Sequence, residues 1–396
     1  MKKILYISYD GLSDTLGQSQ ILPYLIKLSE RGYQFTILSA EKSQYFEQEK
    51  VQIQKLCAQN NISWHYILYR KKPPVISTLR DIAELKKEAH RLQQQENFDI
   101  VHTRSYIPSL IALSLKKKFK LKWLFDMRGF WADERIDGNI WNLSKLHYRW
   151  IYSYFKRKEK TFFQKADAIV SLTYKAKKWM LEQWKVATPI NVIPCATDTV
   201  FFKPKQIEFI HKQENITLGY LGSIGTWYML DEMLDFFKVL QSKYPKAKFK
   251  FITREDKNTI LDKAKEKGIN SSAFTIKAAK REDVPKELSS IDLGIFFIKD
   301  KFSKKASSPV KQGEFMSMGI PVITAKNIGD TDFIIEKYKS GIWVDNFTET
   351  AYQKAIEEIP NLLLLTPNDI RKGAEDYFSL EKGVDTYQKI YEDLLN

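Results

Sequence analysis

The sequence predicts an α/β protein built of two Rossmann-like domains, and three observations lead to this prediction. Short apolar runs typical of buried strands alternate with amphipathic stretches typical of helices along most of the 396 residues. The chain opens with a strand, a helix and a second strand, from Met1–Ser8 to Gln34–Ser39. After a polar stretch, Lys203–Asn215, a second such series begins at Thr217–Leu221. Strands joined by helices run parallel, so we expect ligands at their carboxyl ends.

The elements of the first domain follow from periodicity. Its strands are short and rich in β-branched and aromatic residues: Met1–Ser8, Gln34–Ser39, Trp64–Tyr69, Asp99–His102, Lys122–Asp126, Ala168–Ser171 and Asn191–Pro194. Its clearest helices have apolar residues every three or four positions: one around Leu25, then Ser77–Gln95, Ile107–Lys117, Trp141–Lys165 and Lys175–Trp184. We therefore predict a first domain of residues 1–202.

The second domain repeats this alternation. Its predicted strands are Thr217–Leu221, Lys248–Thr253, Phe274–Ile276, Leu293–Ile298 and Ile320–Ile323. Its predicted helices are Met229–Gln241, Asp283–Ser289, Phe333–Lys339, Glu349–Leu364 and Asp369–Tyr377, and a last helix follows at Leu380–Leu394. The sequence thus predicts a linker at 203–215, a second domain at 216–378 and a C-terminal segment at 379–396.

The stretch from Ser307 to Thr324 has the signals of a short helix of about three turns. Ser308 suits the N-cap, Pro309 suits the first turn, and Gly319 suits the left-handed position that ends a helix. The apolar strand that follows places the helix against a sheet, with its N-terminus at the edge.

The N-terminus of this helix is a candidate anion site. Backbone N–H groups near Val310 and Lys311 point out of it, the helix dipole is positive there, and Lys311 adds a full charge. Glu314 stands one turn further in, where it can accept hydrogen bonds from hydroxyl groups. Groups that donate hydrogen bonds to phosphate, followed by a carboxylate that accepts them from hydroxyls, predict that the ligand is a nucleoside diphosphate with its ribose. The alternative is a capped helix with Glu314 solvated.

Net charge separates the two halves of the chain. The formal charge is +15, and residues 1–200 carry +14 of it. The helix Trp141–Lys165 and the lysines from Lys116 to Lys122 combine basic with aromatic residues. We expect a polyanionic partner for this half, either an acidic membrane surface or a lipid pyrophosphate, with nucleic acid as the alternative. No apolar run is long enough to span a membrane and no signal peptide is evident, so we expect a cytoplasmic protein that is peripheral on the inner face of the membrane.

The Glu314 stretch resembles the donor-site segment of glycosyltransferase family 4, which comprises retaining enzymes of the GT-B fold. The run from Glu314 to Val322 matches the second half of the usual Glu, seven residues, Glu pattern, whereas Ala306 stands in place of the first Glu. The form Ser-Ser-Pro-x-Lys-x-x-Glu is similar to that of bacterial surface-polysaccharide transferases. The resemblance implies two domains facing each other across a cleft, a C-terminal helix crossing back to the first domain, and no metal or other cofactor. Asp330-Thr331-Asp332 has a metal-site pattern, but Asp330 is placed to cap a helix.

Two glycine-containing loops resemble donor-diphosphate loops of this family. One runs from Asp10 to Gln18 and contains Gly17; an ordinary strand-to-helix turn is the alternative. The other contains Gly222 and Ser223. The family's usual arginine and lysine are absent from the second loop, so Lys311 and Arg254 are expected to supply the positive charge.

The segment after Lys122–Asp126 is the candidate acceptor side of the site. Asp126 could orient or deprotonate an acceptor hydroxyl, and Arg128 could bind a phosphate. The alternative is a structural cluster of ion pairs. Many family members have a histidine near here that contacts the donor sugar. This chain has no histidine in the segment, and we expect Asp126 to make the sugar contact instead. His102 closes a strand similar to a D-V-V-H segment of the family, although a local hydrogen bond is favoured for it.

The sequence therefore predicts a retaining glycosyltransferase that moves a sugar from a UDP- or GDP-sugar to a hydroxyl of a lipid-linked or polysaccharide acceptor in cell-envelope glycan synthesis. The predicted catalytic residues are Asp126, Arg128 and Glu314. The predicted donor-binding residues are Gly17, Gly222, Ser223, Arg254, Ser308, Val310, Lys311 and Glu314. A nucleotide-sugar epimerase of the same fold, a basic nucleic-acid-binding protein and a donor-binding pseudoenzyme are the alternatives.

Overall fold

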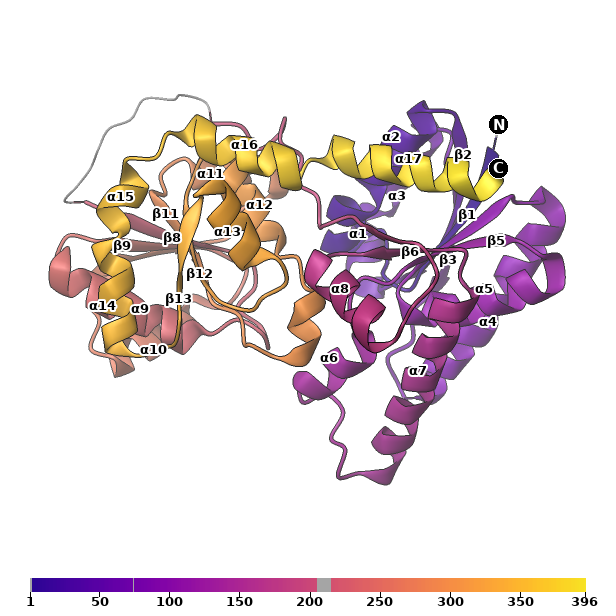
Figure 1. The fold of residues 1–396 in the computed structure, drawn as a ribbon, viewed down its shortest axis with the longest axis horizontal. Coiled ribbons are helices and arrows are strands. Elements are labelled where there is room, and N and C mark those ends of the chain that lie inside the picture. Colours follow the sequence, from indigo (N-terminus) through magenta and orange to yellow (C-terminus); the bar gives the residue numbers. More distant parts are fainter. Residues whose placement is uncertain (1, 74, 205–214) are drawn as a thin grey trace. The chain divides into compact units, whose positions relative to one another are not determined.

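The chain folds into two α/β units, each built around one parallel sheet (Figure 1). The computed structural model describes residues 2–73, 75–204 and 215–396. The first unit comprises Met1–Pro194 with Leu380–Asn396, and the second comprises Cys195–Ser379. The fold class that the sequence predicts is confirmed. The units differ from the predicted domains at their boundaries, because residues 195–202 and Ser379 belong to the second unit. The predicted linker lies, apart from residues 203, 204 and 215, outside the described residues.

The first unit contains a seven-stranded parallel sheet in the order β3-β2-β1-β4-β5-β6-β7. The strands are β1 (Lys2–Ser8), β2 (Tyr33–Glu41), β3 (Ser63–Leu68), β4 (Ile100–Arg104), β5 (Lys122–Asp126), β6 (Ala168–Ser171) and β7 (Ile190–Val192). Ile4 of β1 pairs with Phe35 of β2 and with Ile100 of β4, and all three are fully buried. A central strand covered on both faces needs consecutive apolar residues, which explains the run from Ile4 to Ile7.

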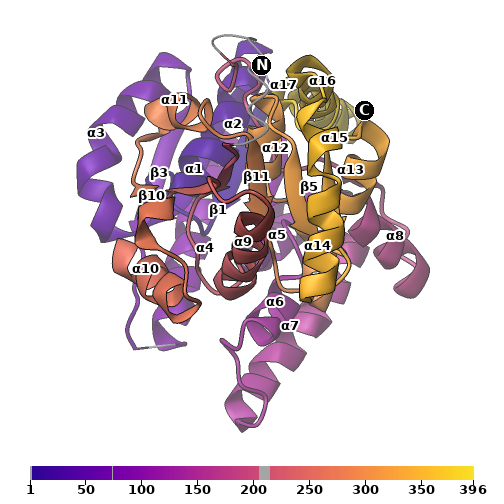
Figure 2. The ribbon, with the colours of Figure 1, turned by 90° about the vertical axis from the view of Figure 1, so that its left-hand side faces the viewer.

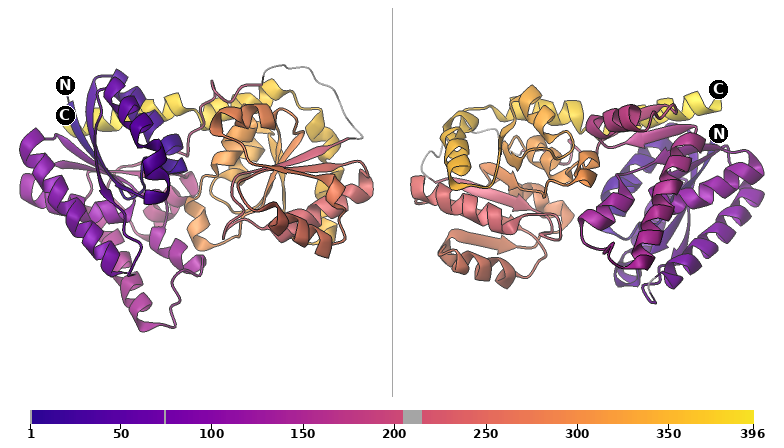
Figure 3. Two further views of the ribbon diagram at one scale, coloured as in Figure 1. Left: turned by 180° about the vertical axis from the view of Figure 1, so that it is seen from behind. Right: turned by 60° about the horizontal axis from the view of Figure 1, so that its bottom comes forward.

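Helices pack on both faces of this sheet (Figure 3). They are α1 (Thr15–Gln20), α2 (Leu22–Glu30), α3 (Ser43–Gln59), α4 (Ile76–Glu96), α5 (Tyr106–Phe119), α6 (Trp131–Asp137), α7 (Leu146–Lys165), α8 (Tyr174–Gln183) and α17 (Leu380–Leu395). The predicted helix from Trp141 begins later than expected. The side chain of Asn142 accepts a hydrogen bond from the backbone N–H of Ser144 at 2.9 Å, and such a local turn competes with helix formation.

Helix α17 completes the first unit although it follows the second unit in the chain. It lies beside α2 (Figure 1), and Arg31 at the end of α2 forms an ion pair with Asp385 at 2.6 Å. The ring of Tyr387 packs edge-on against Tyr24, with centroids 5.3 Å apart. Val384, Tyr387 and Tyr391 are buried, at the spacing of one helix face. Burial of side chains of this size stabilises the unit by about 1.5–3 kcal/mol each.

The second unit repeats the topology with six parallel strands, in the order β10-β9-β8-β11-β12-β13. They are β8 (Thr217–Leu221), β9 (Lys248–Ile252), β10 (Phe274–Lys277), β11 (Leu293–Phe296), β12 (Val322–Ala325) and β13 (Gly341–Val344). Leu221 pairs with Ile252, so β8 and β9 end together. In each unit, the strand order reverses beside the first strand, between β1 and β4 and between β8 and β11. Ligands of open α/β sheets bind outside the carboxyl ends at such a point.

The helices of the second unit again cover both faces of its sheet, with α14 beside α9 (Figure 2). The α-helices are α9 (Leu230–Lys243), α10 (Lys257–Glu266), α11 (Val284–Leu288), α12 (Val310–Ser317), α13 (Thr331–Tyr338), α14 (Glu349–Glu357), α15 (Ile359–Leu363) and α16 (Pro367–Tyr377). Short 3-10 helices occur at η1 (Ser271–Ala273), η2 (Arg281–Asp283) and η3 (Phe302–Ala306). In the part of the chain that the structure describes, no helix combines the length and the apolar character needed to cross a membrane.

Candidate active site

Helix α12 begins at Val310, with Pro309 rather than Ser308 as its N-cap. The predicted N-cap is therefore wrong by one residue, and the helix has eight residues instead of about three turns. Ser308 is held differently: its Oγ accepts a hydrogen bond from the backbone N–H of Cys195 at 3.1 Å. A hydroxyl that accepts in this way still has its own proton to donate. Gly319 has φ = +73°, which confirms the predicted left-handed end.

Lys311, in the first turn of α12, is enclosed by aromatic rings. Its side chain is buried, and its Nζ lies 3.4 Å from the ring centroid of Tyr228 and 4.0 Å from that of Tyr220. Nζ also donates a hydrogen bond to the hydroxyl of Tyr220 at 2.9 Å. Among the described residues, no carboxylate oxygen lies within ion-pair distance of this ammonium group. The cation is therefore stabilised by π faces and one hydroxyl, without a paired counter-charge.

Burial lowers the pKa of Lys311 well below its usual value, and the charge of Glu314 only partly opposes this effect. A buried ammonium group without a paired anion is costly, because it loses its water shell without gaining an equivalent interaction. An anion that entered the site would restore the charged form. These properties make Lys311 a candidate ligand-binding residue.

The loop after β8 lies against Lys311. Gly222 has φ = +102°, a conformation that favours glycine, and a Cβ at this position would lie 3.7 Å from the Nζ of Lys311. Tyr220 connects the two, because its hydroxyl donates to the backbone carbonyl of Ser223 at 2.6 Å while it accepts from Lys311. The Ser223 side chain is exposed. The fold thus brings together Gly222, Ser223 and Lys311, which are about 90 residues apart in the sequence.

Glu314 lies one turn after Lys311 and is partly exposed. Burial raises its pKa, while the charges of Arg281 and Lys311 act in the opposite direction. Arg281 lies in η2 and extends over the rings of Phe201 and Phe202, at 5.6 and 5.7 Å from their centroids. Sequence reasoning missed Arg281, because a polar run of mixed charge around it resembles any solvated turn. It also missed the cage of Tyr220 and Tyr228, which only the tertiary fold assembles.

Arg254 is exposed, two residues beyond β9. Because β9 is the neighbour of β8, Arg254 stands at the same sheet edge as the Gly222 loop. A further basic residue, Lys304 of η3, is buried, and its Nζ lies 3.5 Å from the ring centroid of Trp227 in the Gly222 loop. The edge of the second sheet thus carries several cations, as a diphosphate site requires.

The Asp330 stretch has its carboxylates occupied by protein groups. Asp330 stands at the N-cap position of α13, as expected, but its side chain makes no capping hydrogen bond. Its Oδ2 instead accepts from the hydroxyl of Tyr377 at 2.6 Å. Oδ1 of Asp332 accepts from the hydroxyl of Thr331 at 3.1 Å. These contacts give the acidic residues a structural role.

Gly17 does not lie in a loop, which corrects the sequence prediction. It is buried within α1, and a Cβ there would lie 2.3 Å from the carbonyl oxygen of Gly11. The glycine is needed because α1 packs directly on the preceding loop. That loop is fixed by Glu41, a fully buried carboxylate that accepts from the N–H groups of Leu12 at 2.7 Å and Ser13 at 3.0 Å. A contact between Gly17 and the donor stays a prediction, and the structure gives the residue a packing role.

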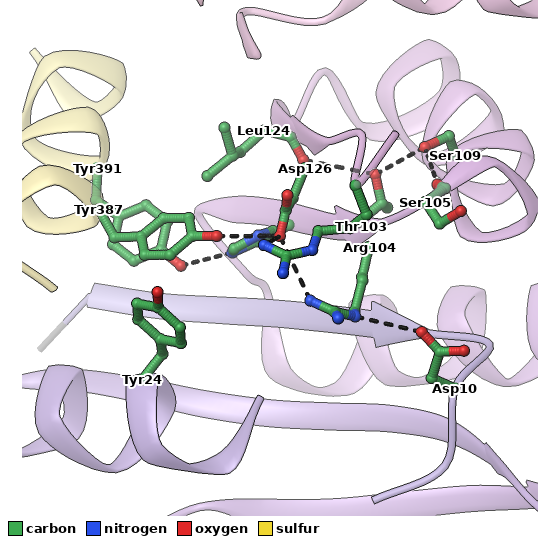
Figure 4. A network of polar contacts seen from close by, with 12 residues as sticks. Asp10, Tyr24, Thr103, Arg104, Ser105, Ser109, Leu124, Asp126, Tyr387 and Tyr391 are labelled. Atoms are coloured by element: carbon green, nitrogen blue, oxygen red, sulfur yellow. Dashed lines mark hydrogen bonds and ion pairs between the residues drawn. The ribbon is translucent and has the colours of Figure 1, made fainter. Parts of the chain in front are cut away.

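Asp126 is the centre of a buried polar cluster in the first unit (Figure 4). Its Oδ2 accepts a hydrogen bond from the hydroxyl of Tyr387 in α17 at 3.0 Å. The same oxygen lies 3.7 Å from Arg128, 3.9 Å from Arg104 and 3.9 Å from His102. Figure 4 shows Arg104 of β4, Asp126 of β5 and Tyr387 of α17 converging, with Asp10 joined to Arg104. The fold therefore brings the predicted residues Asp126 and Arg128 together.

Charge holds Asp126 in its ionised form. Burial alone acts to raise its pKa, but the nearby Arg128, His102 and Arg104 outweigh this effect and lower it. A carboxylate with a lowered pKa is a weak general base, and this one is 1% exposed. Arg128 is held in a left-handed conformation, with φ = +56°, and such strain is often found at functional sites. Contact of Asp126 or Arg128 with a substrate stays a prediction, whereas the role of Asp126 in neutralising two arginines is visible.

His102 is hydrogen-bonded, but the expected local partner is wrong. Its Nδ1 lies 2.7 Å from the hydroxyl of Tyr391 in α17, a residue 289 positions away. Burial lowers the pKa of His102, which favours the neutral ring. The histidine thus connects β4 to the last helix, a contact that no local sequence signal reveals.

Two family models match the chain. The model of Glycosyltransferase Family 4 matches residues 24–201, and that of Glycosyl transferases group 1 matches residues 202–375. The chain belongs to glycosyltransferase family 4. The two models meet between residues 201 and 202. A search of curated proteins finds no match.

Solved structures show the same fold at low sequence identity. Sucrose-phosphate synthase from Thermosynechococcus elongatus is 14% identical with a TM-score of 0.72, and the match covers 100% of this chain and 99% of that one. Anabaena Alr3699/HepE, solved in complex with UDP and glucose, is 11% identical with a TM-score of 0.68 and coverage of 99% and 100%. The lipopolysaccharide outer core galactosyltransferase WaaB, in its apo form, is 13% identical with a TM-score of 0.66 and coverage of 99% of each chain. This glycosyltransferase therefore has a GT-B-like fold.

One departure from the family pattern can be placed in the glycosyltransferase structure. Ala306, which stands where the first Glu of the usual pattern is expected, ends η3 and is 2% exposed. A methyl group that is buried there offers no hydrogen bond to a sugar. This position therefore lacks the carboxylate that the usual family pattern has there.

Proposed function

We propose that this glycosyltransferase is a retaining enzyme that transfers a sugar from a UDP- or GDP-sugar to a hydroxyl of a lipid-linked or polysaccharide acceptor. The observation that carries the donor assignment is the buried ammonium group of Lys311 beside the Gly222 loop and in the first turn of α12. Three sources of positive potential converge there: the lysine, the helix N-terminus and the backbone of a glycine loop. A diphosphate supplies the counter-charge that the described residues do not.

Each group near Lys311 has a role toward such a donor. Lys311 and the N–H groups of Val310 and Lys311 bind the two phosphates, and the hydroxyl of Ser308 donates to one of them. Glu314, one turn along, accepts hydrogen bonds from the ribose hydroxyls. Arg254, at the same sheet edge, adds charge to the diphosphate. The complex of HepE with UDP and glucose supports a donor of this class.

Transfer with retention needs no protein nucleophile in this proposal. The bond between the anomeric carbon and the phosphate oxygen breaks, and the acceptor oxygen bonds to that carbon on the same face. The acceptor proton moves to the leaving phosphate, which becomes the protonated nucleoside diphosphate. Lys311 and the α12 N-terminus stabilise the negative charge that develops on the leaving group. Because the lysine is already dehydrated, its interaction with this charge is stronger than it would be in water.

The acceptor is assigned from the basic first half of the chain. A lipid-linked acceptor carries phosphate or pyrophosphate, and the excess of positive charge in residues 1–200 complements it. The likeness of WaaB, a lipopolysaccharide galactosyltransferase, supports a cell-envelope glycan as the product. The same charge supports a location at the inner face of an acidic membrane.

Donor binding is tested by thermal unfolding of the full chain with UDP, GDP, ADP and dTDP, each alone and as the corresponding sugar conjugates. A ligand of the native state raises the melting temperature, so one base should give a shift that the others do not. Lys311→Met should abolish that shift. Lys326→Met should retain it, because Lys326 is a partly exposed lysine of the same unit that is paired with Asp345. Equal shifts in the wild type and in Lys311→Met would refute the donor site.

Turnover is tested with Glu314→Ala. The loss of two hydroxyl contacts to a carboxylate, at about 1.5–3 kcal/mol each, should lower kcat/KM by about 10²-fold or more. Unchanged turnover would exclude Glu314 from the site. Release of free nucleotide or of an epimerised sugar without an acceptor would support an epimerase instead. Proton NMR of the product, which reports the anomeric configuration, tests retention.

A further inference from the structure

The first unit contains a large pocket that the donor site does not use. Its volume is about 1100 Å³, above the range of about 300–1,000 Å³ that is usual for small-molecule sites. It lies between α4, α5 and the α6–α7 region, and one end reaches Asp10, Arg104 and Ser105 at the carboxyl ends of β1 and β4. Figure 3 shows these long helices side by side over one face of the sheet. The pocket thus connects the ligand-binding edge of the sheet with a channel between helices.

The walls of this pocket are apolar and partly exposed. Leu79 of α4, Trp150 of α7 and Tyr154 of α7 line it, with exposed fractions of 60%, 75% and 41%. Further aliphatic and aromatic lining residues come from all three sides: Ile82, Ile107, Leu110, Leu113, Ile140 and Trp141. Large side chains that gather in a hollow and remain exposed mark a binding surface, because single exposed apolar residues are normally scattered.

The charged groups of the pocket are almost all basic. Six basic side chains line it, and Asp10 is the single acidic one among the lining residues. The basic ones are Lys71, Lys86, Arg104, Lys117, Arg135 and Lys158. Lys86, Lys117 and Lys158 place one cation on each of α4, α5 and α7. An apolar channel with this charge is complementary to a ligand that joins a hydrocarbon chain to an anionic group.

We propose that this pocket binds the hydrocarbon chain and the phosphate groups of a lipid-linked acceptor, a long-chain prenyl phosphate or diphosphate attached to the sugar that carries the reactive hydroxyl group. This inference rests on the proposed glycosyl transfer and specifies its acceptor class and subsite. The reactive hydroxyl group lies at the Arg104 end, because that end opens at the carboxyl edge of the sheet. The hydrocarbon chain of the ligand lies between Leu79 and Trp150. Aliphatic side chains, among them Leu79, Ile82 and Leu110, line the pocket beside the aromatic ones. They suit a hydrocarbon chain, whereas a nucleic-acid platform depends on aromatic faces for base stacking.

Farnesyl diphosphate is a water-soluble probe of this chemistry. Binding to the full-length wild-type chain is measured by calorimetry, with pyrophosphate alone, farnesol alone, and vesicles of phosphatidylglycerol as parallel ligands. The expected result is binding of farnesyl diphosphate at least about tenfold tighter than either fragment, because chain and head group occupy one site. Tryptophan fluorescence should change on binding, since Trp131, Trp141 and Trp150 line the pocket.

Two exposed positions test the pocket without affecting the core. Leu79→Glu and Trp150→Glu place a charge on the apolar wall and should weaken farnesyl diphosphate binding at least about tenfold. Val51→Glu on α3 and Leu181→Glu on α8 are matched controls, because these residues are exposed, at 75% and 42%, and do not line the pocket. The control variants should bind within about twofold of the wild type.

Three outcomes would overturn the proposal. Pyrophosphate that binds as tightly as farnesyl diphosphate would mean an anion site only. Vesicle binding without farnesyl diphosphate binding would mean a membrane-docking surface instead of a pocket. Equal losses in the pocket and control variants would mean that the site lies elsewhere. The UDP-dependent rise in melting temperature is measured in the same variants, so that failure of the acceptor site can be told apart from failure of the donor site.

Discussion

The two units place buried charges at the same edge of similar sheets, but they neutralise them differently. In the first unit, Arg104 and Arg128 surround the carboxylate of Asp126, which also accepts a hydrogen bond from Tyr387. In the second unit, Lys311 faces the rings of Tyr220 and Tyr228 and has no carboxylate within ion-pair distance among the described residues. The charges of the first cluster are compensated by carboxylates of the protein, although Nε2 of His102 and Oδ1 of Asp126 have no hydrogen-bond partner in the part of the chain that the structure describes. The charge of Lys311 is not compensated in this way by any described residue. Charge compensation, rather than burial alone, thus distinguishes a structural cluster from a binding site.

Removal of the carboxylate in the first cluster should have the largest effect on stability. Asp126→Ala leaves two buried arginines without their counter-charge, so we expect a loss of about 3–5 kcal/mol in the free energy of unfolding of the first unit. Urea unfolding followed by tryptophan fluorescence measures it. Binding of UDP to the surviving folded protein should be unchanged, because Lys311 belongs to the other unit. A fully stable Asp126→Ala protein would contradict the structural role.

Two buried lysines of the second unit sharpen the comparison. Lys250 is 8% exposed and paired with Glu287 at 2.8 Å, whereas Lys311 is 6% exposed and unpaired by any described carboxylate. Lys250→Met should destabilise the protein by about 2–3 kcal/mol, because it leaves Glu287 partly buried with Lys277 as its remaining ion-pair partner among the described residues. Lys311→Met should instead raise the melting temperature, by the equivalent of about 1 kcal/mol, while UDP affinity is lost. Similar losses of stability in both variants would show that Lys311 is structural too.

The lowered pKa of Lys311 predicts how UDP binding depends on pH. The phosphates bind the ammonium form, so above the lowered pKa each complex must first take up a proton. UDP affinity should therefore fall as pH rises above that pKa, by up to about tenfold per pH unit. The stability of the protein without UDP should depend on pH in the opposite direction. Between the lowered pKa and the usual value of 10.5, Lys311 is protonated in the unfolded state but not in the folded state, so the free energy of unfolding rises with pH. Calorimetry in buffers of different ionisation enthalpy measures the proton uptake, and Lys311→Met should show neither dependence.

The smallest expected effect concerns the contact between α17 and Asp126. Tyr387→Phe removes one hydroxyl that donates to this carboxylate and keeps the packing of the ring on Tyr24. We expect a loss of about 1.5–3 kcal/mol if the carboxylate stays dry, and about 1 kcal/mol if water replaces the hydroxyl. Tyr377→Phe, which removes a similar bond to Asp330 in the second unit, is the matched control. A loss confined to Tyr377→Phe would contradict the role assigned to α17.

The alternating pattern was sufficient for the architecture and for most strands. Lys122–Asp126 and Thr217–Leu221 have the predicted bounds, because continuous apolar runs between polar turns leave little ambiguity. Helix α3 has no counterpart in the prediction, since its few apolar residues are separated by polar ones, and of those apolar residues described only Phe46, Ile53 and Cys57 are buried. Such a helix forms because a narrow apolar stripe packs on the sheet, which its local sequence does not reveal.

The candidate site was predictable where it depends on local signals and not where it depends on tertiary contacts. Gly222, Ser223 and Lys311 were expected in one site and lie together, since each belongs to a loop or helix at a strand end. The aromatic cage of Lys311 and the contact of His102 with Tyr391 join segments about 90 to 290 residues apart. No periodicity encodes such pairs. Gly17 misled the prediction because glycine serves close packing as well as phosphate binding.

Helix α17 gives the order of synthesis a physical consequence. Tyr387 and Tyr391 reach Asp126 and His102 of the first unit, yet they are translated only after the whole second unit has been made. Until α17 has been made, the surface of α2 that it covers is exposed, and Asp126 lacks the hydrogen bond from Tyr387. The first unit is therefore expected to complete its folding only after the second unit has been synthesised, and the second unit can fold before then.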